Sequence, residues 1–303
     1  MKAAVCRKAG KPNVLKLEEV AKPSPKENEI LVKVFASSVT RGDVILRKIP
    51  HIIFFPIGLI FGFKAMKITG VEYSGEVEEV GSQVSKFKKG DKVLGTTTGL
   101  KFGGNAEYVC VPEKSKKGVI ALKPNNISFS EAAVLPVGGM TALFFLKKID
   151  SMKDLNILVY GASGSVGTYA VQIAKHYGAK VTAVCSKGNM ELIKSIGADH
   201  VIDYNSEDIT KTDYKYDVIF DAVGKISKSS SKNVLKENGK YLTVKYPTKE
   251  INEFMEILCD LISKGKIKAV IDRYYPLEQI VEAHTYVETG HKKGNVVITV
   301  ETK

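Results

Sequence analysis

Hydrophobic positions along the chain follow a strand-like period in the first third and a helical period afterwards. Up to about residue 123 they alternate with polar ones or form short β-branched runs, as at 29–34 and 75–80. Glycine and proline separate these runs, and Pro112 closes one of them, where a central strand would not carry proline. The pattern predicts an antiparallel, barrel-like β domain.

The second zone combines helices with continuous apolar strands. Ser128 and Glu131 have the spacing of a capping box, which predicts the start of a helix. Continuous apolar strands that alternate with helices are typical of a parallel sheet covered on both faces. The strands are expected at 157–160, 180–184, 201–202 and 218–220, and the helices at 166–177 and 190–196.

The third zone begins with a predicted helix at 251–264, which Gly265 ends, and returns to strands at 270–271 and 296–300. We interpret this tail as crossing back to complete the first domain. The predicted division is therefore one domain made of residues 1–123 and 266–303, and a second made of residues 124–265.

Composition narrows the class of protein. The chain has 303 residues, 44% of them hydrophobic, which is enough for two domains or one large one. Its longest apolar run, 52–63, is shorter than the roughly 20 residues of a membrane span. The N-terminus lacks the apolar stretch of a secretory signal. Four scattered cysteines indicate reduced thiols. We expect a cytoplasmic protein without membrane insertion.

The formal net charge of +12 is spread over short lysine clusters, and no nucleic-acid-binding module is visible. We interpret the charge mainly as a solvated lysine surface with a bias towards anionic ligands. No nucleic acid partner is expected.

The most specific signal is a glycine-rich turn between a strand and a helix, the context of a dinucleotide-binding turn. Gly164 would let the backbone approach a pyrophosphate, and Gly167 would let the helix pack closely on the strand. Ala162 replaces the first glycine of the strict fingerprint. A tight turn that binds nothing is the alternative. The residues expected to hold the cofactor here are Gly161, Ser163, Gly164, Ser165 and Val166.

The end of the second strand of this unit predicts which cofactor binds. An NAD-dependent enzyme carries an acid there that binds the 2′-hydroxyl of the ribose. This chain instead has Ser186 and Lys187, which suit a 2′-phosphate. A solvated turn lysine is the alternative for Lys187. The sequence predicts NADPH.

Over nearly its whole length the chain resembles the medium-chain dehydrogenase/reductase superfamily, in its quinone oxidoreductase-like branch. The motifs are 2–5, 70–77, 80–81, 87–93, 161–167, 197–199, 202–204 and 220–224. The resemblance implies a GroES-like antiparallel β-barrel-type domain and a doubly wound, parallel-sheet Rossmann domain, with the active site in the cleft between them. Relatives further imply that Thr141, Tyr204, Val223 and Asn295 line the cofactor site.

The zinc-dependent members of this family bind their catalytic zinc through a cysteine and a histidine. The matching positions here are Thr40 and Val71, neither of which supplies the thiolate or imidazole that zinc prefers. The cysteine-rich structural zinc lobe is also missing, since 95–110 contains only Cys110. No metal site is expected.

Without a metal, the resemblance implies hydride transfer to a quinone or an activated double bond, with the protein binding and orienting the substrate. Thr40 stands where quinone oxidoreductases usually carry an asparagine, and its hydroxyl is a candidate to bind substrate or ribose. Arg41 is a candidate to stabilise an oxyanion, with an ion pair to Asp43 as the alternative. Tyr73 and Tyr246 are candidate proton donors, with simple packing as the alternative.

Two segments depart from simple expectations. The apolar run 52–63 is equally interpretable as a wall of the substrate cleft or as a buried plug. After Val244 the chain leads almost directly to the helix at 251, so the sixth Rossmann strand is expected to be absent. Its loss weighs against the usual homodimer and against full catalytic competence.

The leading hypothesis is a zinc-independent, NADPH-dependent reductase of quinones or α,β-unsaturated carbonyls. A zinc-free alcohol or carbonyl oxidoreductase is the alternative among enzymes. An NADPH-binding sensor or scaffold with little turnover is the alternative from another class.

Overall fold

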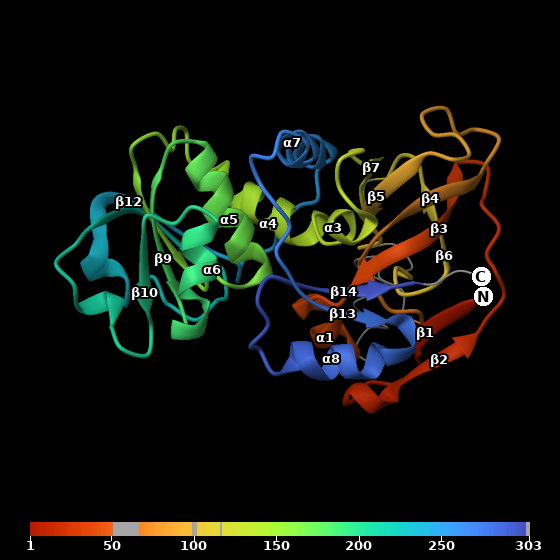
Figure 1. Ribbon diagram of the computed structural model, residues 1–303, viewed down its shortest axis with the longest axis horizontal. Coiled ribbons are helices and arrows are strands. Elements are labelled where there is room, and N and C mark those ends of the chain that lie inside the picture. The colour runs from red at the N-terminus through yellow and green to blue at the C-terminus, as the bar shows by residue number, and fades with distance from the viewer. Residues whose placement is uncertain (51–66, 99–101, 116, 301–303) are drawn as a thin grey trace. The chain divides into compact units, whose positions relative to one another are not determined.

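A computed structural model describes residues 1–50, 67–98, 102–115 and 117–300. The apolar run 52–63, expected to wall the substrate cleft or to form a plug, lies outside these residues. By packing, the chain forms two compact units (Figure 1). The first comprises 1–137, 250–263 and 271–303, and the second 138–249 and 264–270. These units are divided by packing alone. The boundaries expected at 123 and 265, between a GroES-like and a Rossmann domain, stay a prediction.

The first unit is built on a seven-stranded sheet, and a separate two-stranded sheet joins β1 (Lys2–Cys6) and β2 (Leu15–Glu19). One edge of β3 is shared, because β6 pairs with its first half and β14 with its second half. The seven strands are β13 (Ile271–Pro276), β14 (Asn295–Thr299), β3 (Glu29–Ser38), β4 (Glu72–Val80), β5 (Lys92–Thr96), β7 (Ile120–Leu122) and β6 (Tyr108–Pro112).

The C-terminal tail contributes a strand to the sheet of the first unit, because β14 pairs antiparallel with β3. The unit is not wholly antiparallel, since β13 and β14 run parallel. Parallel neighbours need a crossover, and α8 (Ile280–Glu288) supplies it between these two strands. The described strands form an open sheet path and not a closed barrel.

The other α-helices of the first unit within the described residues are α1 (Arg41–Lys48), α3 (Phe129–Ala133) and α7 (Asn252–Ser263). The capping box predicted for α3 is present. The Ser128 hydroxyl accepts from the Glu131 N–H at 3.2 Å, and the Glu131 carboxylate accepts from the Ser128 N–H at 2.8 Å. These bonds satisfy two backbone donors that a helix start leaves unpaired.

The second unit contains a five-stranded parallel sheet, coloured green to cyan in Figure 1. The chain adds β8, β9 and β10 in one direction and then β11 and β12 on the other side of β8, so the order reverses between β8 and β11. No sixth strand extends this sheet within the described residues, as expected. The spatial order is β10 (His200–Asp203), β9 (Lys180–Cys185), β8 (Asn156–Tyr160), β11 (Tyr216–Asp221) and β12 (Leu235–Thr243).

The predicted helices are α5 (Ser165–His176) and α6 (Met190–Ser195). α5 packs on α4 (Pro136–Leu146), and Phe145 of α4 contacts Phe220 of β11 with ring centroids 5.4 Å apart. The opposite face of this parallel sheet lacks the helical cover that the alternation of strands and helices predicts, within the described residues. The described connections from β10 to β12 hold only short 3-10 turns, at 209–211 and 232–234, and their Ile209 and Val234 pack on that face.

All four cysteines are free thiols. No helix in the described part of the chain is long and apolar enough to span a membrane.

Candidate functional site

The site in the second unit is built at the carboxyl edge of the parallel sheet. A sheet of this type binds ligands where the strand order reverses, outside the carboxyl ends of the strands. Here the reversal lies between β8 and β11, and the turn after β8 carries the glycine-rich segment 161–167. Gly164 occupies the N-cap position of α5, where no side chain caps the helix. The positive end of the helix dipole therefore meets this edge without a capping side chain.

The three glycines of the turn differ in whether the fold requires a residue without a side chain at that position. Gly161 has φ +76°, and a Cβ there would lie 2.4 Å from Val223. A Cβ on Gly167 would lie 2.3 Å from the Gly161 carbonyl oxygen, so α5 packs closely on the strand as predicted. Gly164 has φ −80°, and a Cβ there would meet only that same oxygen, at an ordinary 3.5 Å. Nothing inside the unit requires glycine at 164.

The loop after β9 carries Ser186 and Lys187. Ser186 is half-buried and precedes a 3-10 turn, Lys187–Asn189. The Lys187 side chain is exposed and forms no ion pair within the described residues, which leaves its charge available to a ligand. Sequence reasoning missed Asn189, a buried residue whose Nδ2 donates to Ser163 Oγ at 3.0 Å.

The loops after β10 and β11 present Tyr204 and Val223, which are 46% and 42% exposed. Asp221, at the end of β11, is fully buried, and its Oδ1 accepts from the N–H groups of Val223, Gly224 and Lys225 at 3.2, 2.8 and 3.2 Å. It therefore fixes the loop that carries Val223. Its role was not predicted, although it lies inside the family motif 220–224.

Thr141 also belongs to the second unit, where it lies half-buried on α4. The structure thus places Thr141 and the residues of the glycine-rich turn, Ser186, Lys187, Tyr204 and Val223 in one unit. The remaining predicted site residues, Thr40, Arg41, Tyr73 and Asn295, belong to the first.

In the first unit, Thr40 is the N-cap of α1. Its backbone N–H and its hydroxyl donate to Asp43 Oδ2 at 2.8 and 2.6 Å, and its Oγ1 accepts from the Asp43 N–H at 3.1 Å. Burial raises the pKa of Asp43 to about 6. The Thr40 hydroxyl proton is therefore committed to Asp43, which sequence reasoning did not anticipate.

Arg41 is exposed at the start of α1 and forms no ion pair with Asp43 or with any other described residue. Its charge is therefore available to a ligand. Asn295 starts β14, whose Val296 carbonyl accepts from the Val39 N–H at 3.1 Å, so Asn295 lies at the same end of the sheet as Thr40.

Tyr73 lies in the core of the first unit. It is fully buried, its hydroxyl has no partner within the described residues, and burial raises its pKa. These surroundings favour packing over proton donation. Tyr246 is 64% exposed in the second unit.

Glu72 is a further buried acid of the first unit, for which the sequence predicted no role. Ser38 Oγ donates to its Oε1, and the Val137 N–H donates to its Oε2 at 2.8 Å. Burial raises its pKa to about 8, and the charge of Lys292 acts in the opposite direction. Glu72 thereby ties the end of β3, just before Thr40, to the start of α4.

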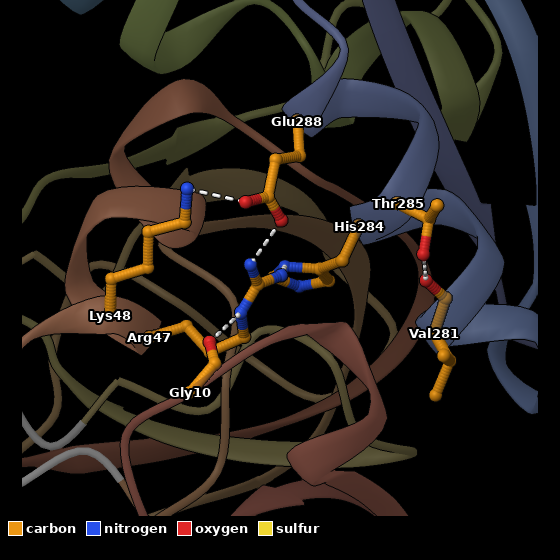
Figure 2. Close-up of polar contacts among 7 residues, drawn as sticks. All are labelled: Gly10, Arg47, Lys48, Val281, His284, Thr285 and Glu288. Atoms are coloured by element: carbon orange, nitrogen blue, oxygen red, sulfur yellow. Dashed lines mark hydrogen bonds and ion pairs between the residues drawn. The ribbon is translucent and has the colours of Figure 1, made fainter.

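A buried polar network fixes α1 to α8 (Figure 2). Arg47 of α1 is 1% exposed and donates to the Gly10 carbonyl at 3.1 Å and to Glu288 Oε2 at 2.5 Å; its Nη1 lies 3.1 Å from His284 Nδ1. Lys48 also pairs with Glu288. Since Thr40 and Arg41 begin the same helix, the network holds the candidate catalytic segment in place.

The network predicts a pH-dependent stability. Burial, aided by the Arg47 charge, lowers the pKa of His284 from 6.5 to about 3. Because the unfolded chain binds this proton first, stability falls as the pH drops from about 6.5 towards 3. Between pH 7 and pH 5 the loss from this group is about 2 kcal/mol. Denaturant unfolding at pH 7 and pH 5 should show that the free energy of unfolding falls less in His284→Gln than in the unmodified protein. An equal fall in both proteins would contradict the role given to His284.

The two positions that match the zinc ligands of the zinc-dependent members, Thr40 and Val71, have other contacts in this structure. Thr40 is engaged with Asp43, and Val71 packs with the apolar residues Phe102, Leu46 and Val137. The described residues contain no group of three or more His, Cys, Asp or Glu side chains able to hold a metal ion.

Comparison with known proteins agrees with this architecture. Residues 26–123 match the family model of the alcohol dehydrogenase GroES-like domain, and 165–270 match that of the zinc-binding dehydrogenases. The chain is 37% identical to a 2-methylene-furan-3-one reductase of Solanum lycopersicum, over 98% of this chain and 79% of that protein. The chain belongs to the medium-chain dehydrogenase/reductase superfamily.

Other members of the superfamily are similar over nearly their full length. A chloroplast envelope quinone oxidoreductase homolog of Arabidopsis thaliana is 35% identical, over 92% of each chain. The solved structure of a quinone oxidoreductase from Coxiella burnetii is 30% identical, with a TM-score of 0.87 over 99% of each chain. The predicted family and fold class are confirmed.

Proposed function

We propose that this medium-chain dehydrogenase/reductase transfers hydride from NADPH to a quinone or an α,β-unsaturated carbonyl, without a catalytic zinc. The observation that carries the proposal is the carboxyl edge of the second unit. There a helix start without a side-chain cap and an N-cap glycine that the fold does not need lie at a strand-order reversal, and the loop after the neighbouring strand β9 carries Lys187, which forms no ion pair with any described residue. The relatives named as NADPH-dependent alkenal/one oxidoreductase and quinone oxidoreductase support this reaction class.

The residues present fit a dinucleotide. The turn 161–167 would hold the pyrophosphate, and Tyr204 and Val223 would line the adenosine and nicotinamide ribose. Bound NADPH supplies the hydride. In the first unit, the Arg41 guanidinium is available to stabilise an oxyanion. While Asp43 is ionised, the Thr40 hydroxyl donates its proton to that carboxylate, so towards a ligand it can act only as a hydrogen-bond acceptor. The reduced substrate also needs a proton, and the fully buried Tyr73 is a poor donor.

The expected cofactor preference is the first test. Charge-assisted contacts from Ser186 and Lys187 to a 2′-phosphate should make NADPH bind more tightly than NADH by about 1–3 kcal/mol. In Lys187→Ala the preference should narrow while NADH binding is retained, as titration calorimetry would show. Equal dissociation constants for both cofactors in the unmodified protein would contradict the role of the loop.

The second test is NADPH oxidation with a panel of quinones, α,β-unsaturated carbonyls and simple aldehydes. Turnover with the first two groups supports the proposal. Turnover with aldehydes alone would indicate the zinc-free alcohol or carbonyl oxidoreductase. Tight NADPH binding without turnover of any substrate would indicate the sensor or scaffold.

Compartment and assembly follow as parts of this proposal. We propose a cytoplasmic protein, although several relatives are named as chloroplastic or mitochondrial. At the edge strand β12, charged Lys236, Glu237 and Lys240 and an irregular register oppose edge-to-edge pairing. We therefore expect no homodimer through this edge.

A further inference from the structure

The contact between Asn189 and Ser163 joins two loops at the carboxyl edge of the second unit. Ser163 belongs to the glycine-rich turn after β8, and Asn189 ends the 3-10 turn after the neighbouring strand β9. The two loops are also tied by backbone, since the N–H groups of Gly161 and Ala162 both donate to the Val184 carbonyl at 3.0 Å. Asn189 is 7% exposed, so its amide is held in place by the surrounding residues.

The direction of this hydrogen bond decides what Ser163 can offer a ligand. A hydroxyl has one proton to donate and two lone pairs, and an amide nitrogen is only a donor. Because Asn189 Nδ2 donates to Ser163 Oγ, the contact uses a lone pair and leaves the hydroxyl proton free. Within the part of the chain that the structure describes, that proton has no acceptor. A hydroxyl fixed in this way is suited to an anionic oxygen.

The same loop carries the groups assigned above to the 2′ position of the ribose. Ser186 and Lys187 lie two to three residues before Asn189, and a Cβ on the intervening Gly188 would have nothing within 4 Å. The space beside this turn is therefore open to a ligand. Ser163, in the glycine-rich turn, is bonded directly to this loop through its side chain.

We propose that Asn189 is a positioning residue for cofactor selection, which holds the Ser163 hydroxyl as a third donor to the 2′-phosphate, beside Ser186 and Lys187. This inference rests on the proposed NADPH function. Selectivity for NADPH would then depend on the turn after β8 as well as on Ser186 and Lys187 in the loop after β9.

Asn189→Asp reverses the hydrogen bond with almost no change in shape. The carboxylate accepts the Ser163 proton and brings a negative charge towards the phosphate. We expect NADPH affinity to fall roughly 10- to 100-fold while NADH affinity stays within about twofold. Ser163→Ala should lower NADPH affinity about 10-fold and again spare NADH. Asn189→Ala in the Ser163→Ala background should then add little.

Titration calorimetry with NADPH, NADH, 2′,5′-ADP and 5′-ADP measures these effects. Asn238→Asp is the matched control, because it adds the same charge on the exposed part of β12. Thermal unfolding of each variant shows whether the second unit is intact. An equal loss of NADPH and NADH in an intact Asn189→Asp variant overturns the inference, and so does no loss of either. If the unmodified protein binds neither nucleotide, the proposed function itself fails.

Discussion

Replacement of Arg47 by methionine should lower the free energy of unfolding of the first unit by about 3–5 kcal/mol. The guanidinium is buried and serves Gly10, His284 and Glu288. Methionine fills similar volume but supplies no donor, so the Gly10 carbonyl and His284 Nδ1 are left buried without a partner. Urea unfolding monitored by far-UV circular dichroism measures the loss.

Arg7→Met is the matched control for this variant. Arg7 also pairs with a carboxylate, that of Glu18, but its side chain is 74% exposed, so the expected loss is at most about 1 kcal/mol. Arg47→Lys should recover only part of the stability, because an ammonium group lacks the planar fork that reaches three acceptors. A loss below about 1 kcal/mol in Arg47→Met would show that the network does not stabilise the unit.

The elements that could be predicted from the sequence are those with a local cause. The capping box at Ser128 and Glu131 needs only four consecutive residues, and the strands of the parallel sheet need only a short apolar run. Gly167 was also predictable, because close packing of α5 on β8 follows from the turn itself. The return of β14 to the first unit followed from a change of period along the chain.

The features that could not be predicted depend on residues far apart in the sequence. His284 and Glu288 meet Arg47 across 237 and 241 positions. Asn189 meets Ser163 across 26 positions, and only the pairing of β8 with β9 brings them together. The short 3-10 turns between β10 and β12 were missed for another reason. Few apolar residues suffice to cover that face, so no helical period is needed there.

Gly164→Ala should weaken nucleotide binding while it leaves the fold intact. Its added Cβ finds ordinary contact at 3.5 Å and an acceptable φ of −80°, so stability should change by less than about 1 kcal/mol. The methyl group would occupy space that a pyrophosphate needs for its approach to the backbone. Overpacking of this kind costs about 1–3 kcal/mol, which corresponds to an increase of about 5- to 150-fold in the dissociation constant for NADPH.

Gly167→Ala is the contrasting variant in the same turn. Its Cβ would lie 2.3 Å from the Gly161 carbonyl oxygen and 2.7 Å from the Ala162 Cα, and backbone atoms cannot move aside as a flexible side chain can. Stability and NADPH affinity should therefore fall together, because α5 must shift away from β8. Thermal unfolding and calorimetric titration of both variants separate the two roles. If Gly164→Ala bound NADPH as tightly as the unmodified protein, the turn would be a packing device only. The glycine that the fold does not need would then have no ligand to explain it.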